Sequence, residues 1–256
     1  MINLKTYKEM DLIRESAFLV SRTHSEIAKL IKPGITSMYL DQIAEEFIRD
    51  NGGKPGFKGY NGFPNTLCVS KDNEVVHGIP NNEGIEEGTI LSIDCGVLMN
   101  GFYGDSAYSY AVGIISDEKQ KLLKVTKEAL QRGVLAATCG NTIGDIGYTI
   151  QNFAESHGYS VVKELVGHGI GRNLHEEPEV PNYGYKGSGS LLEDGMVIAI
   201  EPMINLGSAE VVQKDDGWTI ITKDGLPSAH FEYTVAIKKT GAEILSPFNL
   251  IEEALK

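Results

Sequence analysis

Apolar residues recur every three or four positions along residues 6–31, a spacing that is typical of an amphipathic helix. Pro33-Gly34 ends this segment, because proline cannot continue a helix and glycine favours its termination. Thr36 begins a second periodic segment, residues 36–53, and can cap its helix through the hydroxyl. The N-terminal part of the chain therefore predicts two consecutive helices.

The same scheme returns after residue 115. Ser116 can cap a helical segment over residues 117–138, Gly140 interrupts the pattern, and residues 142–159 read as another helix. The second helices of the two pairs align without a gap. The aligned residues are Gly34, Thr36, Leu40, Phe47 and Gly52 in the first half and Gly140, Thr142, Ile146, Phe153 and Gly158 in the second.

Further matches follow in the same order along both halves. "VVHGI" (75–79) is similar to "VGHGI" (166–170), and "EGTILSID" (87–94) is similar to "DGMVIAIE" (194–201). "GFYGD" and "SAHFE" each end in an acid that precedes a strand-like run. The order predicts an internal duplication with repeats over roughly 5–115 and 116–245; the alternative is two similar halves that share no site.

Residues 92–110, "SIDCGVLMNGFYGDSAYSY", contain the strongest local signal. Asn100-Gly101 between two apolar runs predicts a hairpin with a two-residue turn. If the residues that flank the turn face each other, Asp94 lies opposite Ala107. Because side chains alternate between faces, Asp94 and Asp105 are then diagonal neighbours, with Cβ atoms about 7 Å apart or less.

Two ionised carboxylates at that separation repel each other, and a cation between them would remove the repulsion. The alternative is a solvent-exposed face that carries two hydrated acids. The apolar residues around them, among them Ile93, Val97 and Phe102, argue against an open surface. A pseudo-twofold arrangement of the repeats would bring the equivalent residues of both halves together near its axis. They are His77, Asp94 and Asp105 with His168, Glu201 and Glu232.

Long antiparallel strands with paired helices predict an α+β fold, in which one curved sheet shared by the two halves has helices on its outer face. No Ser/Gly-rich linker separates the halves, so we expect residues 1–256 to form a single catalytic domain. The formal charge of −12 argues against a broad nucleic-acid-binding face but does not exclude a small basic patch. Three scattered cysteines and an N-terminus without a signal peptide or membrane span predict a cytoplasmic protein.

Four acids and one histidine form an oxygen-rich set of candidate ligands: Asp94, Asp105, Glu201, Glu232 and His168. Such sets hold two divalent cations roughly 3.5 Å apart in hydrolytic enzymes. They suit Mn, Fe(II) or Co as readily as Zn, and the chain has no CxxC motif for a structural zinc. Each acid alone has an ordinary structural interpretation, such as a buried ion pair or an exposed strand position.

The segment "LVGHGIGRNLHEEPEVP" carries His168 and His175 among three glycines, which disfavour a helix. In a straight strand their odd spacing would send them to opposite faces, so a bend is needed for both to reach one cavity. We interpret His24 and His157 as structural residues on helices. His230 is ambiguous, because alternation places it on the same face as Glu232.

Five segments together resemble methionine aminopeptidases of the bacterial type I form, over residues 5 to 240. They are "NEVVHGIP", "SIDCGVLMNGFYGDSAYSY", "VGHGIGRNLHEEPEVPNYG", "IAIEPMIN" and "DGWTIITKDGLPSAHFEYT". The resemblance implies the pita-bread fold and removal of the initiator methionine from new polypeptides whose second residue is small. It implies that Asp94, Asp105, His168, Glu201 and Glu232 are metal ligands.

The resemblance also implies the remaining roles. A metal-bridged hydroxide would attack the substrate carbonyl, Glu201 would move the proton, and His77 and His175 would be catalytic residues that contact the substrate. The methionine pocket would contain Tyr60, Phe63, Cys68 and Trp218, although each of these could be ordinary core. The chain departs from the usual family pattern at Leu174, His230 and Tyr233. A monovalent-cation site would lie near Asn73, Val75 and Ser228.

Three other interpretations fit parts of the sequence. Prolidases and aminopeptidases P share the fold but carry an extra N-terminal domain, and type II methionine aminopeptidases carry a helical insertion that is not evident here. A catalytically inactive module that binds protein or RNA would be expected to have lost ligands. We expect a monomer that acts on nascent polypeptide N-termini with transient ribosome association, and that does not bind nucleic acid or membranes stably.

Overall fold

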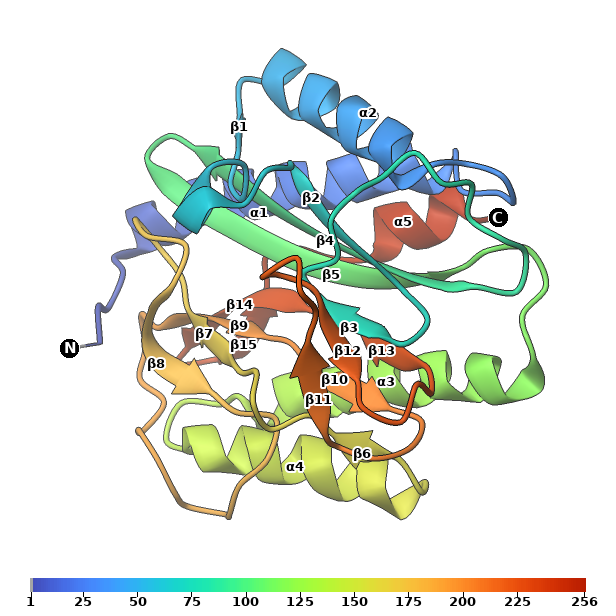
Figure 1. Ribbon diagram of the computed structural model, residues 1–256. Coiled ribbons are helices and arrows are strands. Elements are labelled where there is room, and N and C mark those ends of the chain that lie inside the picture. The colour runs from blue at the N-terminus through green and yellow to red at the C-terminus, as the bar shows by residue number, and fades with distance from the viewer. Residues whose placement is uncertain (1) are drawn as a thin grey trace.

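The computed structural model describes residues 2–256 and contains five α-helices arranged around antiparallel strands (Figure 1). The helices are α1 (Tyr7–Ala28), α2 (Ser37–Asp50), α3 (Asp117–Ala136), α4 (Ile143–Ser156) and α5 (Asn249–Ala254). All four helices expected from the sequence are present, and the α+β prediction is confirmed. No helix within residues 2–256 combines the length and apolar character that crossing a bilayer requires.

The helix starts follow the predicted capping chemistry. The Thr36 hydroxyl accepts from the Tyr39 amide at 3.2 Å, and the Ser116 hydroxyl accepts from the Lys119 amide at 3.3 Å. Thr6 and Glu9 form a capping box at the start of α1. Each of these side chains satisfies an amide that the first turn of a helix leaves without a partner.

The strands of the first half are β1 (Lys54–Pro55), β2 (Leu67–Lys71), β3 (Glu74–Val76), β4 (Ile90–Met99) and β5 (Phe102–Ala111), and a short 3₁₀ helix spans Tyr60–Gly62. Those of the second half are β6 (Ser160–Val161), β7 (Gly167–Gly169), β8 (Glu176–Val180), β9 (Val197–Ile200), β10 (Met203–Asn205), β11 (Val211–Gln213), β12 (Ile220–Thr222), β13 (Ser228–His230), β14 (Tyr233–Lys238) and β15 (Gly241–Ile244).

The β4–β5 hairpin has the predicted register. Met99 pairs with Phe102 and Asp94 pairs with Ala107. Asn100 and Gly101 have φ angles of 53° and 79°, the left-handed conformation that a type I′ turn requires at both positions. Asp94 and Asp105 therefore lie on one face of the hairpin, as the sequence predicted.

Every strand pair is antiparallel, but the hydrogen-bond ladders divide into four sheets instead of one continuous sheet. Side-chain hydroxyls join the halves where β5 meets β13 and β14. The Thr234 hydroxyl donates to the Asp105 carbonyl at 2.7 Å, and the Ser106 hydroxyl donates to the Glu232 carbonyl at 2.7 Å. This junction places Asp105 of one half beside Glu232 of the other.

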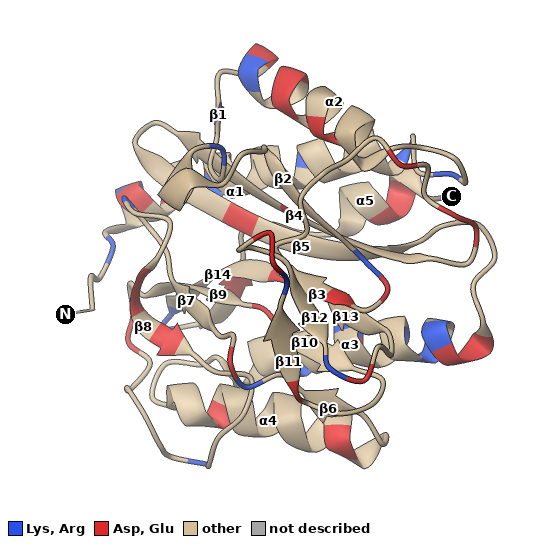
Figure 2. Ribbon diagram, in the orientation of Figure 1, with Lys and Arg blue, Asp and Glu red and all other residues tan. Residues whose placement is uncertain are grey.

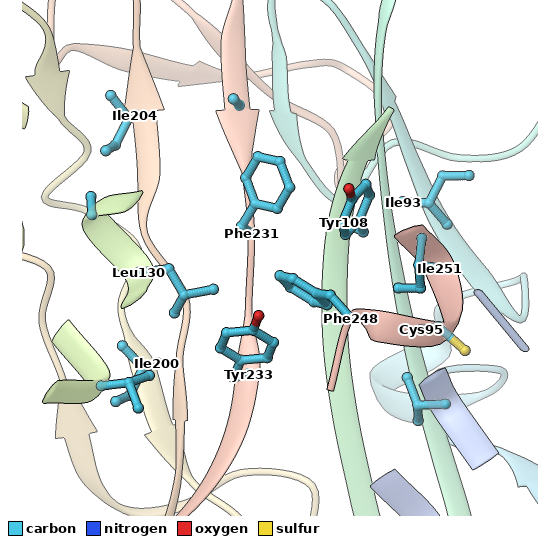
Figure 3. Close-up of a cluster of buried hydrophobic side chains, with 14 of the residues drawn as sticks. Ile93, Cys95, Tyr108, Leu130, Ile200, Ile204, Phe231, Tyr233, Phe248 and Ile251 are labelled. Atoms are coloured by element: carbon cyan, nitrogen blue, oxygen red, sulfur yellow. The ribbon is translucent and has the colours of Figure 1, made fainter. Parts of the chain in front are cut away.

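One aromatic cluster packs against this junction on the helix side (Figure 3). Tyr108 of β5 contacts Phe231 edge-on with ring centroids 5.0 Å apart, and the ring of Phe248 before α5 lies 4.0 Å from that of Tyr233 at a tilt of 34°. Both halves bury apolar surface in this cluster, so they share one hydrophobic core. The cluster fixes β5 relative to β14 and with them the acids near the junction.

Helix α1 packs directly on the backbone of β5 at Gly104. A Cβ atom there would lie 2.3 Å from the Ala17 amide nitrogen. We expect Gly104→Ala to lower the free energy of unfolding by about 3 kcal/mol, because the helix must move away from the strand. Urea unfolding of the metal-free protein measures this. The control is Gly84→Ala, whose Cβ would find its nearest backbone atom at 3.4 Å; equal effects of the two substitutions would contradict the packing argument.

Candidate metal centre

Three strands and two segments at strand ends supply the predicted ligands. Asp94 lies on β4, Asp105 on β5 and His168 on β7, whereas Glu201 directly follows β9 and Glu232 lies between β13 and β14. All five side chains line one cavity of about 210 Å³. The structure thus brings together residues from both halves of the chain, as the sequence predicted for the carboxylates near the axis.

The β7–β8 hairpin brings His168 and His175 to the same cavity. Their ring centroids are 4.3 Å apart and the rings meet edge-on. The strand pairing is irregular between His168 and Gly169, which is the bend that the sequence required. A Cβ atom on Gly169 would lie 2.2 Å from the Glu177 carbonyl oxygen, so glycine permits the close approach of the two strands.

Ligand atoms converge at the centre of the cavity. One donor atom each from Asp105, His168 and Glu232 lies within 4.8 Å of the others. His168 Nε2 is 3.6 Å from Glu201 Oε1, and His230 Nε2 is 3.4 Å from Glu201 Oε2. The Glu201 carboxylate therefore lies between two imidazole rings.

Burial raises the pKa of all four acids. Loss of hydration raises the pKa of Asp94 to about 7 and that of Glu201 to about 8. Burial, reinforced by neighbouring carboxylates, raises the pKa values of Asp105 and Glu232 well above their usual range. Without cations, the folded site therefore binds protons that isolated carboxyls would release.

These residues fit a divalent-metal site. The buried atoms Asp94 Oδ1, Asp105 Oδ1 and Glu232 Oε1 have no hydrogen-bond partner. Within residues 2–256, no lysine or arginine forms an ion pair with any of the four acids. Buried carboxylates are retained when they are paired or bind metal, and the donor set of carboxylates and one imidazole fits a divalent cation.

His77 reaches the cavity from a strained backbone. Its φ angle of 59° lies in the left-handed region, which is unusual for a residue other than glycine. A Cβ atom on the following Gly78 would lie 2.2 Å from the Val69 carbonyl oxygen, so the chain is pressed against β2 at this point. Burial, together with the nearby His230 and His175, lowers the pKa of His77 to about 4, so its ring is neutral at pH 7.

An apolar compartment adjoins the acids in the same cavity. Phe63 and Trp218 meet edge-on with ring centroids 5.1 Å apart, and the Tyr60 hydroxyl lies 2.8 Å from His175 Nδ1. Cys68 also lines the cavity, and burial raises the pKa of its thiol well above the usual range. All four predicted pocket residues therefore lie beside the candidate metal ligands.

Sequence reasoning missed two residues of the cavity wall, Phe57 and Asn61, and did not assign Leu174 to it. A Cβ atom on Gly96 would lie 2.5 Å from Phe57 Cε1, so the ring packs over a glycine of β4. The run "PGFKGYNGF" held a signal for this compartment in its closely spaced aromatics. Only the fold shows that they face the acids.

The remaining singled-out residues have separate surroundings. His24 is buried between the Tyr110 hydroxyl and the Ser106 carbonyl, each at 2.9 Å, and His157 bonds the Phe153 carbonyl at the end of α4. Both histidines are structural, as predicted. Tyr233 belongs to the aromatic cluster and not to the cavity wall. The monovalent-cation site at Asn73, Val75 and Ser228 stays a prediction.

Known sequences resemble this chain over nearly its whole length. Residues 11–239 match the model of metallopeptidase family M24. The chain is 50% identical to methionine aminopeptidase 1 of Bacillus subtilis over 246 residues, which cover 96% of this chain and 99% of the relative. It is 49% identical to a methionine aminopeptidase of Clostridium perfringens, with the same coverage of both chains.

Solved structures agree with these matches. The methionine aminopeptidase of Rickettsia prowazekii superimposes with a TM-score of 0.95 at 39% identity and covers 96% of this chain and 100% of its own. The methionine aminopeptidase of Thermotoga maritima superimposes with a TM-score of 0.95 at 42% identity, and the match covers 96% of this chain and 99% of the other. The predicted pita-bread fold is thereby confirmed. The prolidase of Pyrococcus furiosus, at 24% identity and a TM-score of 0.79, shares the fold over 95% of this chain but only 65% of its own length. The chain belongs to metallopeptidase family M24 and, within it, to the methionine aminopeptidases.

Proposed function

We propose that this enzyme removes the N-terminal methionine from new polypeptides whose second residue is small. The observation that carries this proposal is the joint cavity, in which four acids and an imidazole adjoin an apolar compartment, and three of the acids have a buried oxygen without a hydrogen-bond partner. An exopeptidase for methionine needs both a hydrolytic centre and a pocket for an unbranched apolar side chain. The cavity supplies the two next to each other.

Metallopeptidases of this family use divalent metal, and we propose two ions held by Asp94, Asp105, His168, Glu201 and Glu232. Divalent cations in such a site supply Lewis acidity, which polarises a peptide carbonyl and lowers the pKa of a water molecule. Mn, Fe(II), Co and Zn all suit the donor set of carboxylates and one imidazole. Asp105 and Glu232 come from opposite halves of the chain, and with His168 they each place a donor atom within 4.8 Å of the others, so all three would hold the metal.

Three side chains of the cavity have roles in the proposed reaction. The Glu201 carboxylate accepts the proton of the attacking water and delivers it to the leaving amine. His77 has a neutral ring and donates a hydrogen bond near the scissile nitrogen. His175 uses Nδ1 to bond Tyr60, so its Nε2 is left to donate to the carbonyl oxygen as negative charge develops there.

The pocket explains the preference for methionine. The side chains of Phe63, Trp218, Tyr60 and Cys68 surround the apolar compartment, and a thioether makes favourable contacts with aromatic rings.

The substrates are the N-termini of nascent proteins. A cytoplasmic location, a monomeric state and transient contact with the ribosome are further expectations. In the view of Figure 2, basic positions are scattered among acidic ones over the helices and loops.

A peptide assay tests the proposed function. We expect release of free methionine from Met-Gly-Met-Met and none from Met-Leu-Met-Met, with each of Mn, Fe(II), Co and Zn added in turn to chelated enzyme. We expect the large second residue to fail because the cavity of about 210 Å³ must hold the methionine side chain and the reacting amide together. Cleavage of X-Pro peptides instead would favour a prolidase-like activity, and failure of all four metals to support turnover would refute the proposal.

A further inference from the structure

The N-terminal segment (residues 2–6), which precedes α1, makes a buried ion pair with β8, the strand that begins directly after His175. Lys5 Nζ lies 2.7 Å from Glu176 Oε2, and the two side chains are only 6% and 5% exposed. Lys5 Nζ also donates to the Asn3 carbonyl at 2.8 Å, and the Lys5 amide donates to the Gly195 carbonyl at 2.7 Å. Burying two charges costs desolvation energy that apolar side chains of the same size would avoid, so stability alone does not account for the pair.

Both oxygens of the Glu176 carboxylate have a hydrogen-bond partner. Its second oxygen accepts from the Asn173 amide at 3.1 Å. Burial acts to raise the pKa of Glu176, but the hydrogen bonds from Lys5 and Asn173 outweigh burial and lower it. The carboxylate is therefore ionised at neutral pH, and its direction is set by two donors.

This contact fixes the strand on which His175 depends. Glu176 is the first residue of β8, and His175 immediately precedes it in the bend that leads into the strand. Because the two residues share a peptide bond, holding the Glu176 side chain against Lys5 limits the movement of His175, whose side chain lines the cavity. On the cavity side, the Tyr60 hydroxyl lies 2.8 Å from His175 Nδ1, so the residue is held both through its neighbour and through its ring.

The loop before His175 is clamped by the same contact. A Cβ atom on Gly171 would lie 2.6 Å from Lys5 Cε and 2.8 Å from Glu176 Oε1, and the Tyr103 amide donates to the Gly171 carbonyl at 2.8 Å. The β7–β8 loop is thus packed between the N-terminal segment and the β4–β5 hairpin. Figure 1 shows the start of α1 beside the tip of this loop.

We infer that Lys5 is a positioning residue for turnover: through its ion pair with Glu176, it holds His175 in place at the substrate amide. The inference rests on the proposed function, because His175 acts there on the carbonyl oxygen. It gives the N-terminal segment a part in the reaction although none of its residues lines the cavity.

Steady-state kinetics of Lys5→Met in the full chain, with saturating Mn and Met-Gly-Met-Met, test the inference. We expect kcat to fall on the order of 10- to 100-fold, because a displacement of about 1 Å suffices for such losses. KM should change by less than about threefold, since the methionine pocket is untouched. Mn affinity measured by calorimetry should equal that of the wild type, because no ligand is altered.

Arg172→Gln is the matched control. Arg172 belongs to the same loop and pairs with Glu9 at 3.1 Å, but it is solvent-exposed, so kcat should stay at the wild-type value. Glu176→Gln tests the contact from its other side if Lys5→Met does not fold, and it should lower kcat alike. The double variant Lys5→Met/Glu176→Gln should be no slower than either single variant, because both act through one contact.

Two results would overturn the inference: a kcat of Lys5→Met and Glu176→Gln within about twofold of the wild type, or a parallel loss of Mn affinity and kcat. The second result would mean that the pair supports the metal cavity as a whole. Failure of the wild-type enzyme to release methionine would instead refute the proposed function, so the two failures are distinguishable.

Discussion

Asp105→Asn is expected to lower kcat/KM more than about a thousandfold, equivalent to roughly 4 kcal/mol of transition-state stabilisation. The substitution keeps the volume of the side chain but replaces a negative oxygen donor with an amide group. Asp105 lies at the junction of the halves and contributes a donor atom to the group formed with His168 and Glu232. We therefore expect calorimetry to show weakened or absent Mn binding as well as lost turnover.

The same substitution is expected to stabilise the metal-free protein. Asp105 is 3% exposed, its Oδ1 has no hydrogen-bond partner, and burial and nearby acids raise its pKa. An amide removes one ionisable group from this crowded set and can donate to a neighbouring carboxylate. The Asp105 carboxyl must take up a proton when the metal-free protein folds at neutral pH, and a neutral amide removes that cost, so the free energy of unfolding should rise by about 1 kcal/mol or more. Activity and stability should thus move in opposite directions, as is usual for a site built for function.

Asp41→Asn is the matched control for a buried aspartate outside the cavity. Asp41 Oδ1 accepts from the amides of Thr66 and Leu67 at 2.9 and 2.8 Å, and Oδ2 accepts from Asn65. This carboxylate is satisfied, so Asp41→Asn should lower stability and leave Mn binding intact. Normal turnover of Asp105→Asn, or destabilisation of its metal-free form like that of Asp41→Asn, would contradict the assignment of Asp105 as a ligand.

Local chemistry was enough to predict much of the fold. The register of β4 and β5 followed from Asn100-Gly101 alone, because a two-residue turn determines which residues face each other. Thr36 and Ser116 marked helix starts, because their hydroxyls satisfy the first-turn amides. These features depend on residues close together in the sequence, where few alternatives compete.

Long-range contacts were less accessible. Repeat matching indicated that Asp105 and Glu232 belong together, but not that Ser106 and Thr234 hydroxyls would join the halves in place of a continuous ladder. Phe57 and Asn61 were missed as cavity residues, because a loop can bring its aromatics to many places. The Lys5–Glu176 pair was invisible for the same reason, since nothing local distinguishes either residue from a surface charge.

The metal-free enzyme should lose stability as the pH rises from about 6.5 to 8. Below that window the buried histidines oppose the loss, because burial lowers the pKa of His24 and His77 to about 4 and that of His168 to about 3, so the unfolded chain binds protons that these folded rings do not. The pKa of Asp94 is raised from 3.8 to about 7 and that of Glu201 from 4.5 to about 8, in both cases mainly by burial. Between the unfolded and the folded pKa values, the folded protein holds protons that the unfolded chain has released. The stability that these two groups contribute is therefore fully present below about pH 4. It is lost progressively as the pH rises through their folded pKa values of about 7 and about 8.

Each such carboxyl contributes up to about 1.4 kcal/mol per pH unit within its window, so the chelated protein should lose roughly 3 kcal/mol between about pH 6.5 and pH 8, where the histidines no longer titrate in either state. Urea unfolding in the presence of a chelator measures this loss. With saturating Mn, the dependence should reverse, because the cation binds the ionised carboxylates and binding strengthens as protons leave. The two curves must then diverge with rising pH. A chelated protein whose stability is unchanged or higher at pH 8 would show that the four acids are already compensated by charges within the fold, and the metal site would lose its physical basis.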